Sequence, residues 1–386
     1  MGMRIAFQSL AAFCLSTTAL TAPAVAASFS VGGGTINTSQ ADNSQDNTGT
    51  SGGFILQPNT AGNNDILTIT GVTISNTSGT PTGRALDFGD TLPSSGSYSI
   101  TMNGSNVSAK AGSGVAALVA ESSNGNISFD SAGGAANTIS GPIGINLNSN
   151  GGNISIKTGA DTITTSSVTA EILYATTTGT GTISIDSVGA TLTSNGLYGI
   201  AAVSGGSGLT TIGGLNGGIA STINVTNGSG IFTTTGGNQN ITVAGGGVIN
   251  ALDGMTLQGL AANVDSFGTI NATNNAIAVL NGTGTALTVT LEPGSVTKGA
   301  VVGGTSNDVV NIAGGAQIAN ATFDGGAGSN SFNLTGLPVS SGTLAVNTIS
   351  NFSLFQDSSL GIWTLTGTTT KCDALDRDRW HAFHCQ

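Results

Sequence analysis

The chain has 386 residues, of which 61 are glycine and only 7% are charged, and its formal net charge is −11. Soluble domains carry roughly 25% charged residues and about 7% glycine, so both values lie far outside the norm. Disordered chains combine low hydrophobicity with high net charge. Here 38% of the residues are hydrophobic, and they recur at regular intervals, so we expect a folded chain. Low-complexity disorder is the alternative that composition leaves open.

Basic residues are too few for a nucleic-acid-binding surface. Between residues 28 and 370 they are Arg84, Lys110, Lys157 and Lys298, against 16 acidic residues. A basic stripe is the electrostatic footprint of nucleic-acid binding, so no nucleic-acid partner is expected. The same segment contains no cysteine, and its stability must therefore come from packing and not from disulfides.

Residues 1–27 are expected to be a secretory signal peptide. Arg4 precedes an apolar stretch that ends in the small residues Ala24-Val25-Ala26 before Ala27, which predicts cleavage after residue 26 or 27. A retained membrane anchor is the alternative, but polar residues interrupt the run, which is short for a span of about 20 apolar residues. Cys14 follows a phenylalanine, which argues against a lipoprotein signal, and we expect it to be removed with the signal.

Residues 28–113 are predicted to form an N-terminal cap and irregular first coils. Residues 66–69 and 72–74 have the alternation of short strands, whereas residues 40–53 form a polar stretch. Repeat proteins need atypical terminal repeats to cover the open core, and this segment has that position in the chain.

Aliphatic residues recur at nearly regular intervals in the next segment, 114–370. The three series are Leu118, Ile145, Ile172 and Ile200; Ile127, Ile154, Ile183 and Leu209; and Ile249, Ile270, Leu291 and Ile312. Repeats of roughly 20–50 residues are typical of solenoids, in which each coil buries its apolar face only when the next coil stacks on it. Segment 114–370 is therefore predicted to be a stack of repeats.

Short strand patterns lie inside these repeats. Residues 126–129, 153–156 and 182–185 alternate polar and apolar side chains, which is the period of a strand with one buried face. Asn-Gly pairs, such as those at 103–104 and 124–125, predict turns because both residues tolerate positive φ. We therefore expect an all-β fold, a right-handed parallel β-helix with coils of about 21–27 residues. Stacked asparagine side chains are expected to bond along the columns.

The sequence offers little for catalysis, and we expect no catalytic, cofactor or metal site. The carboxylates are scattered, and Arg84, Lys110, Lys157 and Lys298 look isolated. Stacking could still bring Asp130 near Asp161 or Asp186, but acid and base partners for a site are not evident. A cluster of three or more acids with a nearby Lys or Arg would favour an enzyme, whereas a smooth Thr/Asn face would favour adhesion.

Two glycine-rich segments, 303–308 and 324–330, partly match the Gly-Gly-x-Gly-x-Asp pattern of calcium-binding β-rolls. The second has Asn330 where that pattern needs Asp, and the two segments are not in tandem. We expect turn chemistry at both.

The last residues, 371–386, form an atypical tail that carries six charges, both histidines and the two remaining cysteines. Cys372, His381, His384 and Cys385 match no compact zinc-finger spacing. A disulfide between the cysteines and free thiols both stay open, as does the role of the histidines. With no histidine before residue 381, a nucleophile–histidine pair is not available to the repeats.

The segment before the tail carries the most specific motif. Residues 349–354, Ile-Ser-Asn-Phe-Ser-Leu, and 361–367, Gly-Ile-Trp-Thr-Leu-Thr-Gly, resemble the closing coil of a bacterial autotransporter (type V secretion) passenger domain. The resemblance covers about 28–367 by architecture and about 300–367 by motif. It implies export, passage across the outer membrane of a Gram-negative bacterium, and surface display in adhesion or aggregation. The partners implied are host or cell-surface molecules, or other copies of the chain.

The chain departs from that family after the motif, because the β-barrel translocator does not follow. We therefore expect a passenger that lacks its barrel, which would be secreted or displayed at the cell surface, or periplasmic if the chain is truncated. Two alternatives stay open, namely a secreted β-helical carbohydrate-active enzyme and a non-functional truncation product.

Overall fold

The computed structural model describes residues 28–38, 54–56, 65–76, 84–88, 96–110, 116–214, 217–280, 283–337 and 340–367. The predicted signal peptide, the polar stretch 40–53 and the tail 371–386 lie outside the described residues, so those expectations stay predictions. The described part is all-β, as predicted, with one 3-10 turn, η1 (Val346–Thr348). It contains no helix long and apolar enough to cross a membrane.

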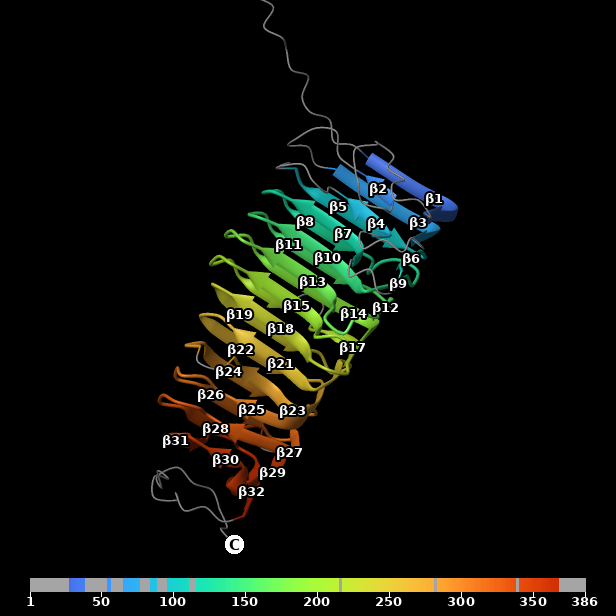
Figure 1. Ribbon diagram of the computed structural model, residues 1–386. Coiled ribbons are helices and arrows are strands. Elements are labelled where there is room, and N and C mark those ends of the chain that lie inside the picture. The colour runs from blue at the N-terminus through green and yellow to red at the C-terminus, as the bar shows by residue number, and fades with distance from the viewer. Residues whose placement is uncertain are drawn as a thin grey trace, which may run out of the picture.

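The strands stack in three parallel columns that together form an elongated body (Figure 1). Column A contains β5 (Tyr98–Asn103), β8 (Ile127–Asp130), β11 (Ile154–Thr158), the first part of β14 (Ile183–Ser194), β16 (Thr210–Ile212), β19 (Asn238–Val243), β22 (Ala261–Ser266), β24 (Ala286–Leu291), β26 (Val309–Ala313), β28 (Ser331–Thr335) and β31 (Leu354–Asp357). Column B contains β6 (Asn106–Ala109), β9 (Thr138–Gly141), β12 (Thr162–Thr165), the second part of β14, β17 (Ala220–Val225), β20 (Val248–Ala251) and the first parts of β23 (Thr269–Val279), β25 (Val296–Val302) and β27 (Gln317–Asp324).

Column C contains β2 (Phe54–Leu56), β4 (Leu86–Phe88), β7 (Ala116–Ser122), β10 (Ile143–Ser149), β13 (Glu171–Thr177), β15 (Tyr198–Ser204), β18 (Ser229–Thr235), β21 (Asp253–Gln258), the later parts of β23, β25 and β27, and β30 (Ile349–Ser350). At the amino end, β1 (Ser28–Thr38) and β3 (Asp65–Asn76) extend columns A and B. At the carboxyl end, β29 (Ser341–Ala345) and β32 (Ile362–Thr366) form a separate two-stranded sheet.

The core is the space between the three columns, and the inward residues of each coil fill it. Ile127, Ile154 and Ile183 occupy one register position in column A and are each at most 1% exposed. In these three strands the inward isoleucines alternate with outward Ser, Asp or Lys. Because the side chains of a strand point to opposite faces in turn, the predicted alternation accounts directly for which residues form the core.

Two of the predicted positions are wrong by one residue. Thr210, not Leu209, continues the series of Ile183, and Leu209 is 40% exposed. Leu173, not Ile172, pairs with Ile145 and with Ile200. Both errors have the same cause: the coils differ in length at their corners, so a constant step along the sequence does not stay in register.

The third predicted series joins residues from two different columns. Ile249 pairs with Ile270 in column B, but Ile270 then pairs with Thr297 and not with Leu291. Leu291 belongs to column A, where it pairs with Ile312. In column C the register step from Ile200 leads to Ile231, which makes that coil longer than the predicted range allows. The predicted upper limit for the coil length is therefore too low.

A column of glycines marks the corner between columns C and A, and we call it the glycine corner. Its members are Gly96, Gly125, Gly152, Gly181 and Gly208. A Cβ atom on each of the last four would overlap the carbonyl oxygen of the glycine one coil earlier. Of the Asn-Gly pairs, the one at 124–125 has no positive φ, whereas Gly104 has φ +57°. The glycine at residue 125 is thus required by close contact between coils and not by the φ that was predicted.

Candidate binding face

The charged residues considered above do not gather into one cluster. Asp130, Lys157 and Asp186 share one outward row of column A, because Lys157 is in register with both carboxylates. Asp161 lies elsewhere, buried near the start of column B, where its carboxylate accepts hydrogen bonds from Ser131 Oγ (2.5 Å) and from the backbone N–H of residue 137 (2.9 Å). Stacking therefore places Asp130 in one row with Asp186 but not with Asp161, and the row holds two acids with one lysine.

Arg84 is not isolated, contrary to the sequence-based expectation. Its Nη1 lies 2.6 Å from Oδ2 of Asp87, whose side chain is fully buried in β4. A buried carboxylate needs such a partner because its desolvation is costly. This arginine therefore has a structural partner.

Asp308 lies in the first glycine-rich segment, and both of its carboxylate oxygens accept hydrogen bonds from backbone N–H groups. Oδ1 accepts the N–H of Leu287 (2.7 Å) and Oδ2 accepts the N–H of Gly304 (2.8 Å). Burial raises the pKa of this carboxyl above its ordinary value, and the two hydrogen bonds partly oppose that shift. In the second segment, Asn330 Oδ1 accepts the N–H of Asp308 (2.8 Å) and its amide donates to the carbonyl of Asn351 (2.9 Å). These are the contacts of turns, and the described residues contain no group of three His, Cys, Asp or Glu that could hold a metal ion.

The outward face of column B is a regular polar surface. One row runs through Thr164, Thr193, Asn224, Asn250, Asn271 and Lys298. The amide of Asn250 donates to Oδ1 of Asn224 (2.9 Å), and the amide of Asn271 donates to Oδ1 of Asn250 (3.0 Å). These side chains line a shallow groove of about 400 Å³ that ends at Lys298. The predicted asparagine stacking is therefore present.

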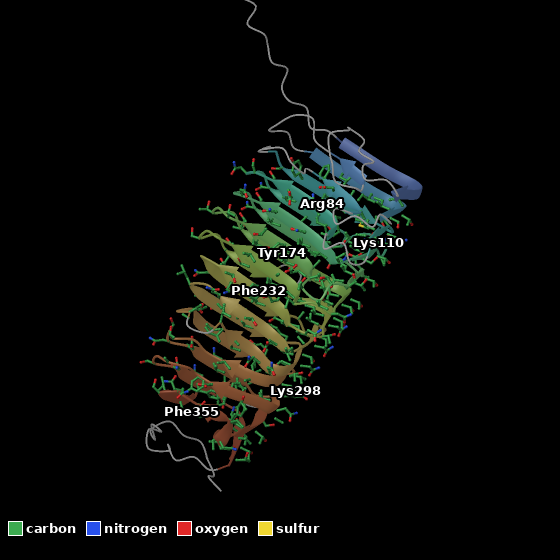
Figure 2. The ribbon with its side chains drawn as sticks, in the orientation of Figure 1. Arg84, Lys110, Tyr174, Phe232, Lys298 and Phe355 are labelled. Carbon is green, nitrogen blue, oxygen red and sulfur yellow. The ribbon has the colours of Figure 1, made fainter. Side chains whose placement is uncertain are left out.

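Three aromatic side chains stand out on column C, and we call them the aromatic patch. They are Tyr174 in β13, Tyr198 in β15 and Phe232 in β18, all on outward positions and all half-buried. Figure 2 shows Tyr174 and Phe232 on the same face of the stack. The rings of Tyr198 and Phe232 stack with centroids 4.2 Å apart and an interplanar angle of 17°.

The patch is arranged around a small residue, Ala201. This alanine is in register with Tyr174 on one side and with Phe232 on the other. It occupies an outward row and yet is only 1% exposed, because larger neighbours cover it. The small side chain of Ala201 therefore lies between Tyr174 and Phe232 and leaves room for the neighbouring rings.

A carboxylate borders the aromatic patch. Glu171 is in register with Tyr198, and burial is the main cause that raises the pKa of its carboxyl above the ordinary value. The pKa of the Tyr198 phenol is also raised, first by burial and then by the negative charge of Glu171. Next to Tyr174 in its row lies Asn146, whose buried Oδ1 accepts no hydrogen bond from a described residue.

Hydroxyl and amide groups continue from the patch along column C. Ser229 Oγ and Thr256 Oγ1 lie 2.8 Å apart beside Phe232. A second outward row runs through Asn148, Thr176, Val203, Thr234 and Gln258. Aromatic surface flanked by a few hydrogen-bonding groups is the usual composition of a ligand-binding surface, so this face is the strongest candidate site in the described part of the chain.

Sequence analysis did not identify the aromatic patch. The step from Tyr174 to Tyr198 is much shorter than the step from Tyr198 to Phe232, so no constant period connects the three rings. The available signal was strand alternation, which puts each ring on the outward side of its own strand. The tail residues whose role stayed open, Cys372, His381, His384 and Cys385, lie outside the described residues. Comparisons of the chain with protein-family models, with curated proteins and with solved structures give no match.

Proposed function

We propose that this chain is an exported passenger of the autotransporter type, a right-handed parallel β-helix that acts as a structural or adhesive protein at the surface of a Gram-negative bacterium. Its partners would be cell-surface or host molecules, or other copies of the chain, and its binding surface would be the aromatic patch on column C.

The observation that carries this proposal is the continuous parallel register from β1 to β31, which turns the three outward faces into long, nearly uncharged surfaces. A row of Thr and Asn runs along column B, which is the smooth surface expected of an adhesive protein, whereas column A also carries the charged row of Asp130, Lys157 and Asp186. The proposed right-handed coil follows from the general preference for right-handed parallel crossovers. The export route rests on the apolar N-terminal stretch and on the motif at 349–367.

The alternative of a carbohydrate-active enzyme has weaker support. Its criterion was three or more acids with a basic residue on one face, and the row of Asp130, Lys157 and Asp186 holds two acids. We therefore prefer the adhesive interpretation.

Expression of the full chain in a Gram-negative host tests the export step. The mature chain should begin at residue 27 or 28 by N-terminal sequencing and should be recovered outside the cytoplasm. A variant with both Ala24 and Ala26 replaced by Asp should stay uncleaved, because the cleavage site needs small residues. An intact N-terminus on a cytoplasmic wild-type chain would contradict the proposal.

A further inference from the structure

We propose that the aromatic patch binds a neutral polysaccharide, with the apolar faces of its sugar rings on Tyr174 and Phe232. This inference rests on the proposed function as a surface-binding protein and names the ligand class of the same site.

The patch offers the surface that a sugar ring needs. A pyranose presents C–H groups on its faces and hydroxyl groups around its edge, so it packs on an aromatic face while its rim stays available for hydrogen bonds. Tyr198 and Phe232 are stacked on each other at 4.2 Å, which holds the phenylalanine ring in place. A pre-positioned ring loses little conformational entropy when a ligand binds.

The two outer rings suit an extended ligand. Tyr174 and Phe232 are separated by one strand, because both are in register with Ala201. Neighbouring strands lie about 4.8 Å apart, so the two rings are about 10 Å apart along the stack. A linear chain of sugars that lies along the stack can therefore contact both rings, and the outward rows of column C continue in the same direction.

The rim of the patch can bond hydroxyl groups. The carboxylate of Glu171, which is in register with Tyr198, can accept hydrogen bonds from sugar hydroxyls. On the other side, the hydroxyls of Ser229 and Thr256 can donate or accept. Both sides of the aromatic surface thus offer partners for the edges of a sugar ring.

The charged residues near the aromatic patch disfavour an anionic ligand. The strands that carry the patch and their neighbours, β10, β13, β15, β18 and β21, contain no Lys or Arg, whereas Glu171 and Asp253 are on them. A polyuronate or a phosphate would be repelled by these two carboxylates and would find no basic side chain on these strands to pair with. A protein partner of ordinary affinity buries about 800 Å² on each side, with an apolar centre. Three half-buried rings on a polar face provide little apolar surface for such an interface, so a protein partner is disfavoured.

Calorimetric titration of the purified mature chain tests the proposal. The neutral probes are cellohexaose, laminarihexaose and chitohexaose, and the anionic probe is polygalacturonate. We expect at least one neutral hexasaccharide to bind and polygalacturonate not to bind. Phe232→Ala and Tyr174→Ala should each weaken that binding at least about fivefold, whereas Tyr174→Phe should keep it.

Phe267→Ala is the matched control, because this phenylalanine is 42% exposed and lies between β22 and β23, away from the patch. Its binding should equal that of the wild type, and thermal unfolding of all variants should show that they remain folded. Absence of binding to all three neutral probes at millimolar concentration would overturn the proposal. Equal binding by the wild type and both alanine variants, or self-association that Phe232→Ala abolishes, would overturn it too. N-terminal sequencing is independent of these results, so failure of glycan binding is distinguishable from failure of the export proposal.

Discussion

Replacing Gly152 by alanine would put a methyl group into the backbone of the preceding coil at the glycine corner. The added Cβ atom would overlap both the carbonyl oxygen and the carbonyl carbon of Gly125. Backbone atoms cannot rotate away as a flexible side chain can. The two successive coils that contain β8 and β11 therefore have to separate locally. The hydrogen bond from the N–H of Ile127 to the carbonyl of Asn153 (2.9 Å) and the bond from the N–H of Asn153 to Oδ1 of Asn126 (2.8 Å) join the same two coils.

The size of the effect follows from these contacts. Overpacking of a close-packed site costs typically about 1–3 kcal/mol, and each hydrogen bond that is stretched or lost costs about 1 kcal/mol. We therefore expect Gly152→Ala to lower the free energy of unfolding by about 2–5 kcal/mol.

Urea unfolding followed by far-ultraviolet circular dichroism measures this loss. The matched control is Gly133→Ala, because a Cβ atom at Gly133 would have no neighbour within 4 Å and its φ is not positive. The control should stay within about 0.5 kcal/mol of the wild type. The same unfolding midpoint for Gly152→Ala and Gly133→Ala would refute the close-contact explanation of the glycine corner.

Three further predictions concern the end of the stack, the amide rows and pH. Phe332→Ala removes a fully buried ring that contacts three other phenylalanine rings, so it should lower the free energy of unfolding by about 3–5 kcal/mol. Amide hydrogen exchange should accelerate in β28 and β31. Unchanged protection of these strands would contradict the packing. Asn250→Ala removes two amide hydrogen bonds, whereas Asn263→Ala removes one. In urea unfolding, Asn250→Ala should lower the free energy of unfolding by about 1–2 kcal/mol, and by more than Asn263→Ala does. Because burial raises the pKa of Glu171 above its ordinary 4.5, the folded state holds this proton to a higher pH than the unfolded state does. The free energy of unfolding should therefore fall as pH rises from about 4.5 through the raised pKa, and Glu171→Gln should reduce that slope between pH 4 and 7, whereas an identical slope would contradict the shift.

The inward residues of the coils were predictable where strand alternation and spacing agreed. Ile127, Ile154 and Ile183 fulfil both criteria, and the register confirms them. The next inward position belongs to Thr210, which is fully buried although it carries a hydroxyl. A search for aliphatic residues selects the neighbouring Leu209 instead. Burial of a hydroxyl depends on the contacts of the folded stack, and the sequence pattern does not contain them.

The outward contacts were not predictable, because they join residues from coils of unequal length. That Tyr174 and Phe232 lie on either side of Ala201 is evident only once the register of three strands is known. Arg84 and Asp87 are close in the chain, but their pairing depends on the burial of the aspartate in β4. Each further corner of variable length adds uncertainty to the register, so prediction of surface sites becomes less certain along a repeat protein of this kind.

The asparagine rows also give the stack an electrical direction. Each asparagine amide that donates to the side-chain oxygen of another asparagine, among the described residues, donates to one in the preceding coil: Asn250 to Asn224, Asn271 to Asn250, Asn263 to Asn240 and Asn333 to Asn311. An amide group has a dipole of about 3.5 D, and bonded amides polarise one another, so these dipoles add along the long axis of the molecule. The bonded amides therefore give these rows one common polarity, directed along the stack.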